Sequence, residues 1–114
     1  MNIFCEIEKR LNREPDRLDM GHYHTLESGE EAFTLDQILD PATSHCLLGW
    51  IEVILLEYNL AGRRRYGVDP YEWTQDQLVR LGYHPIPWGI VFADEKSALK
   101  VIRGRAAEER ELTN

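Results

Sequence analysis

The sequence predicts a single α+β domain, mostly helical, in which a buried apolar helix over residues 44–60 is wrapped by three or four further helices and a small antiparallel sheet. The 114 residues suffice for one hydrophobic core, and the hydrophobic fraction of 43% is ordinary for a folded protein. Between residues 44 and 60, apolar side chains occupy nearly every face of a helix. Such a helix must be covered on most sides, so it is predicted to form the core.

Shorter elements are predicted before this central helix. A first helix that ends or bends at Pro15 is predicted by apolar residues at helical spacing, namely Ile3, Phe4, Ile7 and Leu11. Residues 22–26 and 31–35 flank a glycine-containing turn, which predicts a hairpin of two short strands. Thr34 and Gln37 have the spacing of a capping box and predict a single helical turn.

Capping residues predict where the central helix and the next helix begin. Thr43 and Ser44 are the candidate caps of the central helix. Asp69 followed by Pro70 is typical of a helix start and predicts a helix over residues 70–81. Three of its apolar side chains, or near neighbours of them, are expected to be buried: Trp73, Leu78 and Leu81.

Two more elements are predicted in the last part of the chain. Residues 88–92 are aromatic and β-branched, which predicts a strand, and Pro85 and Pro87 restrict any earlier strand to a sheet edge. Asp94 is the expected cap of a last helix. Its inward positions are predicted at Ala98, Leu99, Val101, Ile102 and Ala106. The polar tail 108–114 is expected to fray.

Acidic residues are concentrated in the first part of the chain. Residues 1–62 hold twelve acids against four bases (−8), whereas residues 63–114 hold eight acids against nine bases (+1), which gives the net charge of −7. Nucleic-acid binding needs a positive face, so direct binding to nucleic acid is disfavoured. The balance favours a protein partner with a basic surface.

Neither a secretory signal nor a membrane span is predicted. The longest nearly uncharged run, residues 41–51, is shorter than the roughly 20 residues that cross a bilayer. Cys5 and Cys46 lie in apolar helical patterns typical of buried thiols, and a single bridge between them stays open. We therefore expect a soluble, cytoplasmic protein without a cofactor, either as a monomer or as a homodimer whose second copy covers part of the central helix.

Three segments occur in an order that resembles a known family. They are Met-Gly-His-Tyr at residues 20–23, Asp-Pro-Ala-Thr-Ser-His-Cys-Leu-Leu-Gly at residues 40–49, and Ile-Pro-Trp at residues 86–88. This order is similar to that of small uncharacterised actinobacterial and phage proteins with a Cys-x-x-Gly helix start and a late Trp-containing strand. The chain departs from their pattern at His45, Trp50 and Gly89-Ile90. The resemblance implies a fold and a bacterial or phage context, and no activity.

Cys46 is the candidate nucleophile of an alternative function, a cysteine hydrolase or transferase. In a helix that begins at Ser44, the Cys46 thiol lies in the first turn, where the helix dipole lowers a thiol pKa. Such an enzyme needs a histidine as base, and the candidates are His84, His45, His22 and His24. The competing interpretation is that Cys46 is a small apolar residue of the core.

Two weaker hypotheses concern small ligands. Zinc accepts a set of two histidines from a strand and the His-Cys pair at the helix start, which are His22, His24, His45 and Cys46. Surface histidines in a hairpin are the competing interpretation. Three consecutive basic residues after the central helix offset its dipole or, in the second interpretation, bind a small anion: Arg63, Arg64 and Arg65.

The leading hypothesis is a non-enzymatic binding or regulatory protein that acts through protein–protein contacts. One predicted contact region is acidic and consists of Glu27, Glu30, Glu31, Asp36 and Asp40. The other is extended and aromatic and contributes Tyr83, His84 and Trp88. A phage-encoded inhibitor of a host nucleic-acid-handling complex fits this charge, because surface carboxylates can occupy sites that normally take phosphates.

Overall fold

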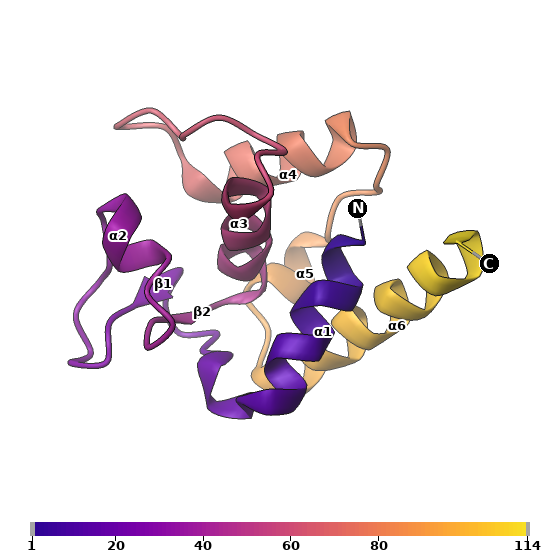
Figure 1. Cartoon of the computed structure of the whole chain (residues 1–114), viewed down its shortest axis with the longest axis horizontal. Helices are drawn as coiled ribbons and strands as arrows, with labels where there is room; N and C mark the ends of the chain where they lie inside the picture. Colours follow the sequence, from indigo (N-terminus) through magenta and orange to yellow (C-terminus); the bar gives the residue numbers. More distant parts are fainter. Residues whose placement is uncertain (1, 114) are drawn as a thin grey trace.

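Helix α3 (Leu47–Glu57) runs through the middle of the molecule, and the other elements are arranged around it (Figure 1). The structure is a computed structural model that describes residues 2–113. The other elements are α1 (Ile3–Arg13), the 3₁₀ helix η1 (Pro15–Arg17), β1 (His24–Thr25), α2 (Leu35–Ile38), β2 (Ser44–His45), α4 (Pro70–Arg80), α5 (Trp88–Val91) and α6 (Glu95–Thr113). The predicted class, a mostly helical α+β fold, is confirmed.

The number of helices around α3 is larger than predicted. Among the described residues five α-helices accompany it, of which α2 and α5 are four residues long. The capping box of α2 and the tertiary packing of both helices allow such single turns. Neither α2 nor α5 would be stable as an isolated helix. Within residues 2–113, no helix combines the length and the apolar character that crossing a membrane requires.

The burial of α3 confirms the prediction of a water-excluded central helix. Nine consecutive residues, from Leu47 to Leu55, are buried. The helix is shorter than residues 44–60, because Ser44 and His45 form β2 and the helix ends at Glu57. The N-cap is therefore Cys46 and neither Thr43 nor Ser44. The Cys46 Sγ accepts a hydrogen bond from the Gly49 amide at 3.4 Å.

The small sheet pairs segments that the sequence did not associate. β1 is antiparallel to β2, with His24 opposite His45 and Thr25 opposite Ser44. The predicted second strand, residues 31–35, contacts β1 only through a bridge between Thr25 and Glu31. The chain cannot continue as a strand there, because the capping box of Thr34 and Gln37 starts α2, as predicted.

Helices α1, α4 and α6 follow their predicted starts. Pro15 terminates α1 and begins η1, and Asp69 caps α4 through hydrogen bonds from two amides to its side chain. In α4 Leu78 is buried and Trp73 is only half-buried, while Leu81, the C-cap residue that follows the helix, is 40% exposed. The inward face of α4 is completed by polar residues, Thr74 and Gln75.

Helix α6 lies along α1 and extends further than predicted. Of its expected inward positions, Ala98, Ile102 and Ala106 are fully buried, and Leu99 and Val101 are partly buried. The helix continues to Thr113, so residues 108–113 of the polar tail are helical, and their fraying in solution stays a prediction. Glu109, in the last turns, is buried and accepts a hydrogen bond from the Cys5 amide at 2.7 Å, which attaches this end of α6 to α1.

Residues 88–91 form helix α5 and not the predicted strand. The Pro87 carbonyl accepts hydrogen bonds from the amides of Ile90 and Val91 at 2.8 and 3.2 Å. Val91 is buried, whereas Trp88 is 50% exposed. β-Branched and aromatic composition favours a strand only where a partner strand is available, and the one sheet of the described chain lies elsewhere.

Candidate functional site

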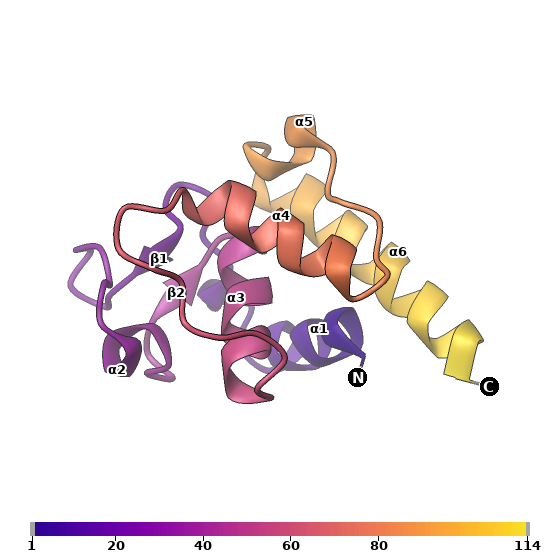
Figure 2. The ribbon, with the colours of Figure 1, turned by 90° about the horizontal axis from the view of Figure 1, so that it is seen from above.

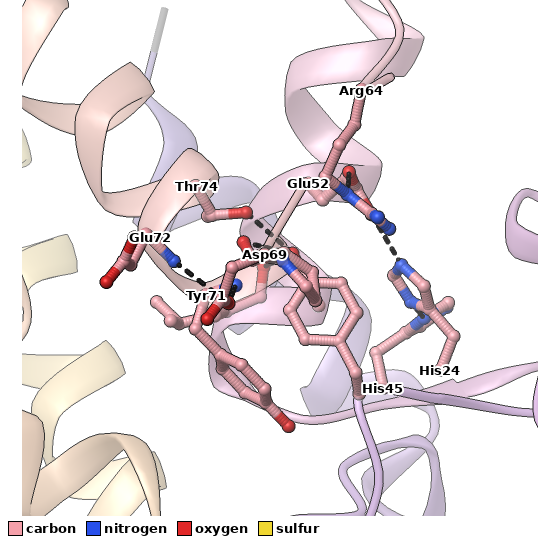
Figure 3. A network of polar contacts seen from close by, with 12 residues as sticks. His24, His45, Glu52, Arg64, Asp69, Tyr71, Glu72 and Thr74 are labelled. Atoms are coloured by element: carbon pink, nitrogen blue, oxygen red, sulfur yellow. Dashed lines mark hydrogen bonds and ion pairs between the residues drawn. The ribbon is translucent and has the colours of Figure 1, made fainter. Parts of the chain in front are cut away.

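A buried carboxylate organises the polar interior of the protein. Glu52 lies in the middle of α3 and is 1% exposed. Its Oε1 accepts a hydrogen bond from His24 Nε2 at 2.7 Å, and its Oε2 accepts one from Arg64 Nε at 3.0 Å. Figure 3 shows these three side chains and the contacts that join them. A buried charge requires such partners, because removing one of them costs about 3–5 kcal/mol.

The two buried histidines form a hydrogen bond with each other. The register of β1 and β2 places them opposite each other, and His24 Nδ1 lies 2.7 Å from His45 Nδ1. Because His24 donates from Nε2 to Glu52, its Nδ1 is the acceptor, and the Nδ1–H of His45 donates to it. Both ring nitrogens of His24 are thus engaged within the protein.

The electrostatics keep the histidines neutral and Glu52 charged. Burial lowers the pKa of His24, and burial together with the neighbouring His24 lowers the pKa of His45 to about 2. Burial alone would raise the pKa of Glu52, but hydrogen bonds from His24 and Arg64 hold it below its ordinary value. The network is therefore one ion pair, Glu52 with Arg64, extended by two neutral imidazoles.

Gly49 allows the sheet to approach α3 closely enough for these contacts. A Cβ atom at this position would lie 2.1 Å from the Tyr23 carbonyl oxygen and 3.2 Å from His24 Nδ1. The same Tyr23 carbonyl accepts a hydrogen bond from the Cys46 amide at 3.1 Å. Only a residue without a side chain fits between the helix and this carbonyl.

Tyr23 joins the network to α4. Its hydroxyl forms a hydrogen bond of 2.6 Å with Thr74 Oγ1, and burial holds its pKa well above the ordinary value, so the phenol stays neutral. The guanidinium of Arg64 lies over the Tyr23 ring, with Cζ 5.7 Å from the ring centroid. Arg64 is therefore fixed both by a carboxylate and by an aromatic face.

A cavity of about 610 Å³ borders this network. It lies among α2, α3, the start of α4 and the segment 63–67, and this volume is typical of small-molecule sites. Its aromatic lining consists of Tyr23, Phe33, Tyr66 and Tyr71. Its charged lining consists of Glu31, Glu52, Arg63, Arg64 and Arg65.

Aromatic contacts continue from the cavity to the surface of α5. The Tyr71 ring contacts the Tyr23 ring at a centroid distance of 5.1 Å and the Phe92 ring at 5.3 Å. Phe92 in turn stacks with Trp88 at 6.4 Å. The side chain of Trp88, one of the predicted contact residues, is thus connected to the cavity wall by ring-to-ring contacts.

The structure does not supply the thiolate that the hydrolase hypothesis needs. Burial raises the pKa of Cys46 to about 11, and Sγ accepts a hydrogen bond from the Gly49 amide. In the described chain no histidine forms a hydrogen bond with this sulfur. His84 is exposed, and His45 donates to His24 instead. Cys46 acts here as the N-cap of α3.

The four candidate zinc ligands are not gathered around one point. His22 is exposed, with Nδ1 3.8 Å from Asp19 Oδ2, whereas His24 is buried and bound to Glu52. His24 and His45 contact each other directly, and Cys46 is bound to the Gly49 amide. No group of three or more His, Cys, Asp or Glu residues within 2–113 is placed to hold a metal ion.

The predicted contact residues fall on two different surfaces. All members of the acidic set are exposed: Glu27, Glu30, Glu31, Asp36 and Asp40. In the second set, His84 and Trp88 are exposed, but Tyr83 is half-buried and its hydroxyl donates to Glu109. Tyr83 therefore links α6 to the preceding loop.

The three consecutive arginines have different environments. Arg64 is half-buried and paired with Glu52, while Arg63 and Arg65 are exposed. All three line the cavity. They lie beyond the end of α3, in the segment that leads to α4.

No protein-family model, curated protein or solved structure matches this chain. The resemblance to small actinobacterial and phage proteins therefore stays a prediction.

Sequence reasoning missed the pairing of Glu52 with His24 and Arg64. One signal was present, since Glu52 is a charged residue inside a helix predicted to be covered on all sides. A buried carboxylate must find donors, and few histidines and arginines in the chain can provide them. The choice among those donors depends on tertiary contacts.

Proposed function

We propose that this protein is a non-enzymatic binding protein that contacts a partner protein with a basic surface through residues 27–40. We call this segment, which contains α2, the acidic lobe. The observation that carries the proposal is that its five carboxylates are exposed and that none forms an ion pair with a described residue. Unpaired charges of one sign create a potential that attracts a basic partner.

The acidic lobe contains no basic residue of its own. The chain contains no Lys or Arg from residue 18 to residue 62, a stretch that includes the whole lobe. Elsewhere several acids are paired, for example Glu57 with Arg10 at 2.5 Å and Glu8 with Arg110 at 2.8 Å. Helix α2, the helix of the lobe, lies near one end of the long axis of the molecule (Figure 1).

An exposed aromatic ring stands in the middle of the acidic lobe. Phe33 is 76% exposed, although its backbone is held by the capping box, with the Gln37 side chain accepting from the Phe33 amide at 2.9 Å. Ordered, exposed aromatic side chains are typical anchors of protein interfaces. Phe33 would supply apolar contact area, and the surrounding carboxylates would steer and orient the partner.

The partner class that fits best is a protein that handles nucleic acid. Such proteins carry clustered Lys and Arg residues that normally bind phosphates, and carboxylates can occupy the same positions. With the bacterial or phage context that the resemblance implies, the protein would act as an inhibitor of a nucleic-acid-handling complex. It would compete with the nucleic acid and would bind none itself.

The acidic lobe is tested by removing its charge without changing its shape. We expect the amide variant Glu27→Gln, Glu30→Gln, Glu31→Gln, Asp36→Asn, Asp40→Asn to lose binding to a sensor coated with polylysine and to basic nucleic-acid-binding proteins of a bacterial extract. Binding of the unchanged protein should weaken steeply between 50 and 300 mM salt, since exposed charges are screened over about 10 Å at 0.1 M.

A matched control distinguishes an effect of the lobe from an effect of the total net charge. The control carries the same number of amide substitutions at exposed acids outside the lobe: Asp16, Glu72, Asp76, Glu108 and Glu111. We expect it to bind like the unchanged protein. Equal loss in both variants, or capture of the same partners by the lobe variant, would show that the lobe is not the contact surface.

A further inference from the structure

Arg64 is held rigidly at the wall of the cavity while part of its guanidinium is unused. Its Nε and Nη2 donate to Glu52 at 3.0 and 3.4 Å, and Glu52 is fixed inside α3. Nη1 donates to no acceptor among residues 2–113, and the side chain is 22% exposed. A prepositioned guanidinium loses little side-chain entropy when it binds a ligand oxygen.

The charges that line the cavity favour an anion. Three arginines face two acids there, a formal charge of +1, in a protein whose net charge is −7. Glu52 is already matched by Arg64, so Arg63 and Arg65 remain against Glu31 alone. Neither Arg63 nor Arg65 forms an ion pair with a described residue. Both are therefore available to a ligand oxygen.

The rings that line the cavity favour a flat ligand. Phe33 is 76% exposed, and Tyr66 is fully exposed at the cavity rim. Tyr71, on the α4 side, is held by its ring contacts with Tyr23 and Phe92. Three aromatic side chains at one cavity suit a planar ring, since nucleobases stack on such rings.

We propose that the cavity binds a small nucleotide, with its base among Phe33, Tyr66 and Tyr71 and its phosphate at the arginines of residues 63–65. The volume of about 610 Å³ lies within the range that holds ligands of this size. Arg64 gives the phosphate a fixed donor, and its two neighbours add charge. This inference goes beyond the proposed protein partner and does not depend on it.

The proposal is tested by calorimetric titration with adenosine monophosphate, adenosine and inorganic phosphate as separate probes. We expect the nucleotide to bind at least tenfold more tightly than either fragment, because only the nucleotide engages both the rings and the arginines. Equal affinity for adenosine would overturn the phosphate site. Equal affinity for inorganic phosphate would overturn the base site.

Two variants at exposed positions test the two halves of the site without disturbing the core. Arg63→Gln with Arg65→Gln should weaken nucleotide binding at least tenfold, whereas the matched double variant Arg80→Gln with Arg103→Gln should bind normally, since those residues are exposed and do not line the cavity. Tyr66→Ala should weaken the nucleotide and leave inorganic phosphate unchanged. Unchanged nucleotide affinity in the double variant Arg63→Gln with Arg65→Gln, or in Tyr66→Ala, would refute the proposed nucleotide site.

Discussion

Glu52 explains why a carboxylate is retained in the most apolar part of the chain. It connects α3 to β1 through His24 and to the segment after α3 through Arg64. Replacing such a network by apolar residues can be neutral, whereas removing one member leaves an unpaired buried group. We therefore expect the network to fix how the segments are arranged around α3 and to contribute less to overall stability than its burial suggests.

The buried histidines make stability sensitive to mild acid. The folded-state pKa values of His24 and His45 lie below the unfolded value of about 6.5, so as the pH falls through 6.5 the unfolded chain binds protons more readily than the folded protein. Stability is complete above pH 6.5 and falls below it, by up to about 1.4 kcal/mol per pH unit for each histidine. Urea unfolding at pH 7.5, 6.5, 5.5 and 5.0 measures this slope.

Histidine variants identify the source of that slope. His45→Gln removes one of the two groups, so its unfolding free energy should depend less on pH in this window. The exposed residues His22 and His84 serve as controls, and His22→Gln with His84→Gln should keep the original slope. A free energy of unfolding that is constant or rises on acidification would contradict the neutral state of the buried pair.

Elements with local signals were predictable, and elements that depend on distant partners were not. The starts of α2 and α4 follow from their caps, and the burial of α3 follows from its composition. By contrast, β1 pairs with β2, and no short-range pattern indicates that choice. Likewise Val91 of α5 is buried although the residue run forms a helix, because the one sheet among the described residues consists of β1 and β2 and offers α5 no partner strand.

The candidate site was less predictable than the fold. His24 and Arg64 are 28 and 12 residues away from Glu52 in the chain, and no periodicity relates them. The sequence did single out His24, His45 and the three arginines, but for metal and anion binding separately. Their meeting at one buried carboxylate depends on the register of β1 and β2 and on the path of the chain after α3.

Gly49 is the point where α3 and the sheet depend on each other. We expect Gly49→Ala to destabilise the protein by roughly 1–3 kcal/mol or more, as overpacking does in cores, because its Cβ would lie 2.1 Å from the Tyr23 carbonyl oxygen. The matched control is Gly104→Ala in α6, where no atom lies within 4 Å of the added carbon. That control should gain up to about 1 kcal/mol through helix propensity. Equal unfolding midpoints for the two variants would contradict the close approach at Gly49.

The acidic lobe and the arginine-lined cavity occupy different positions along the long axis of the molecule. The molecule measures 39 × 27 × 26 Å, and the acidic lobe lies at one end, with the arginine-lined cavity between it and α3. Helix α6 extends to the other end, and α1 lies between α6 and the lobe (Figures 1 and 2). A basic protein approaching the lobe would therefore meet Phe33 and the mouth of the cavity together.

The self-contained burial of α3 argues for a monomer. Its nine buried residues are covered within one copy, so the sequence-based reason for a homodimer no longer applies. A net charge of −7 also opposes self-association at low salt. Light scattering coupled to size exclusion should give the mass of one chain, 13.3 kDa. A stable mass of two chains would instead implicate the exposed rings of α5.

The attachment of the last turns of α6 to α1 has a practical consequence for tethering. In both ribbon views the two ends of the described chain lie on the side away from α2 (Figures 1 and 2). A fusion domain, a dye or a biosensor surface joined at either terminus would therefore leave the acidic residues and the pocket mouth facing outward. The protein can therefore be immobilised through either terminus, and the partner-binding kinetics measured with the two attachments should agree.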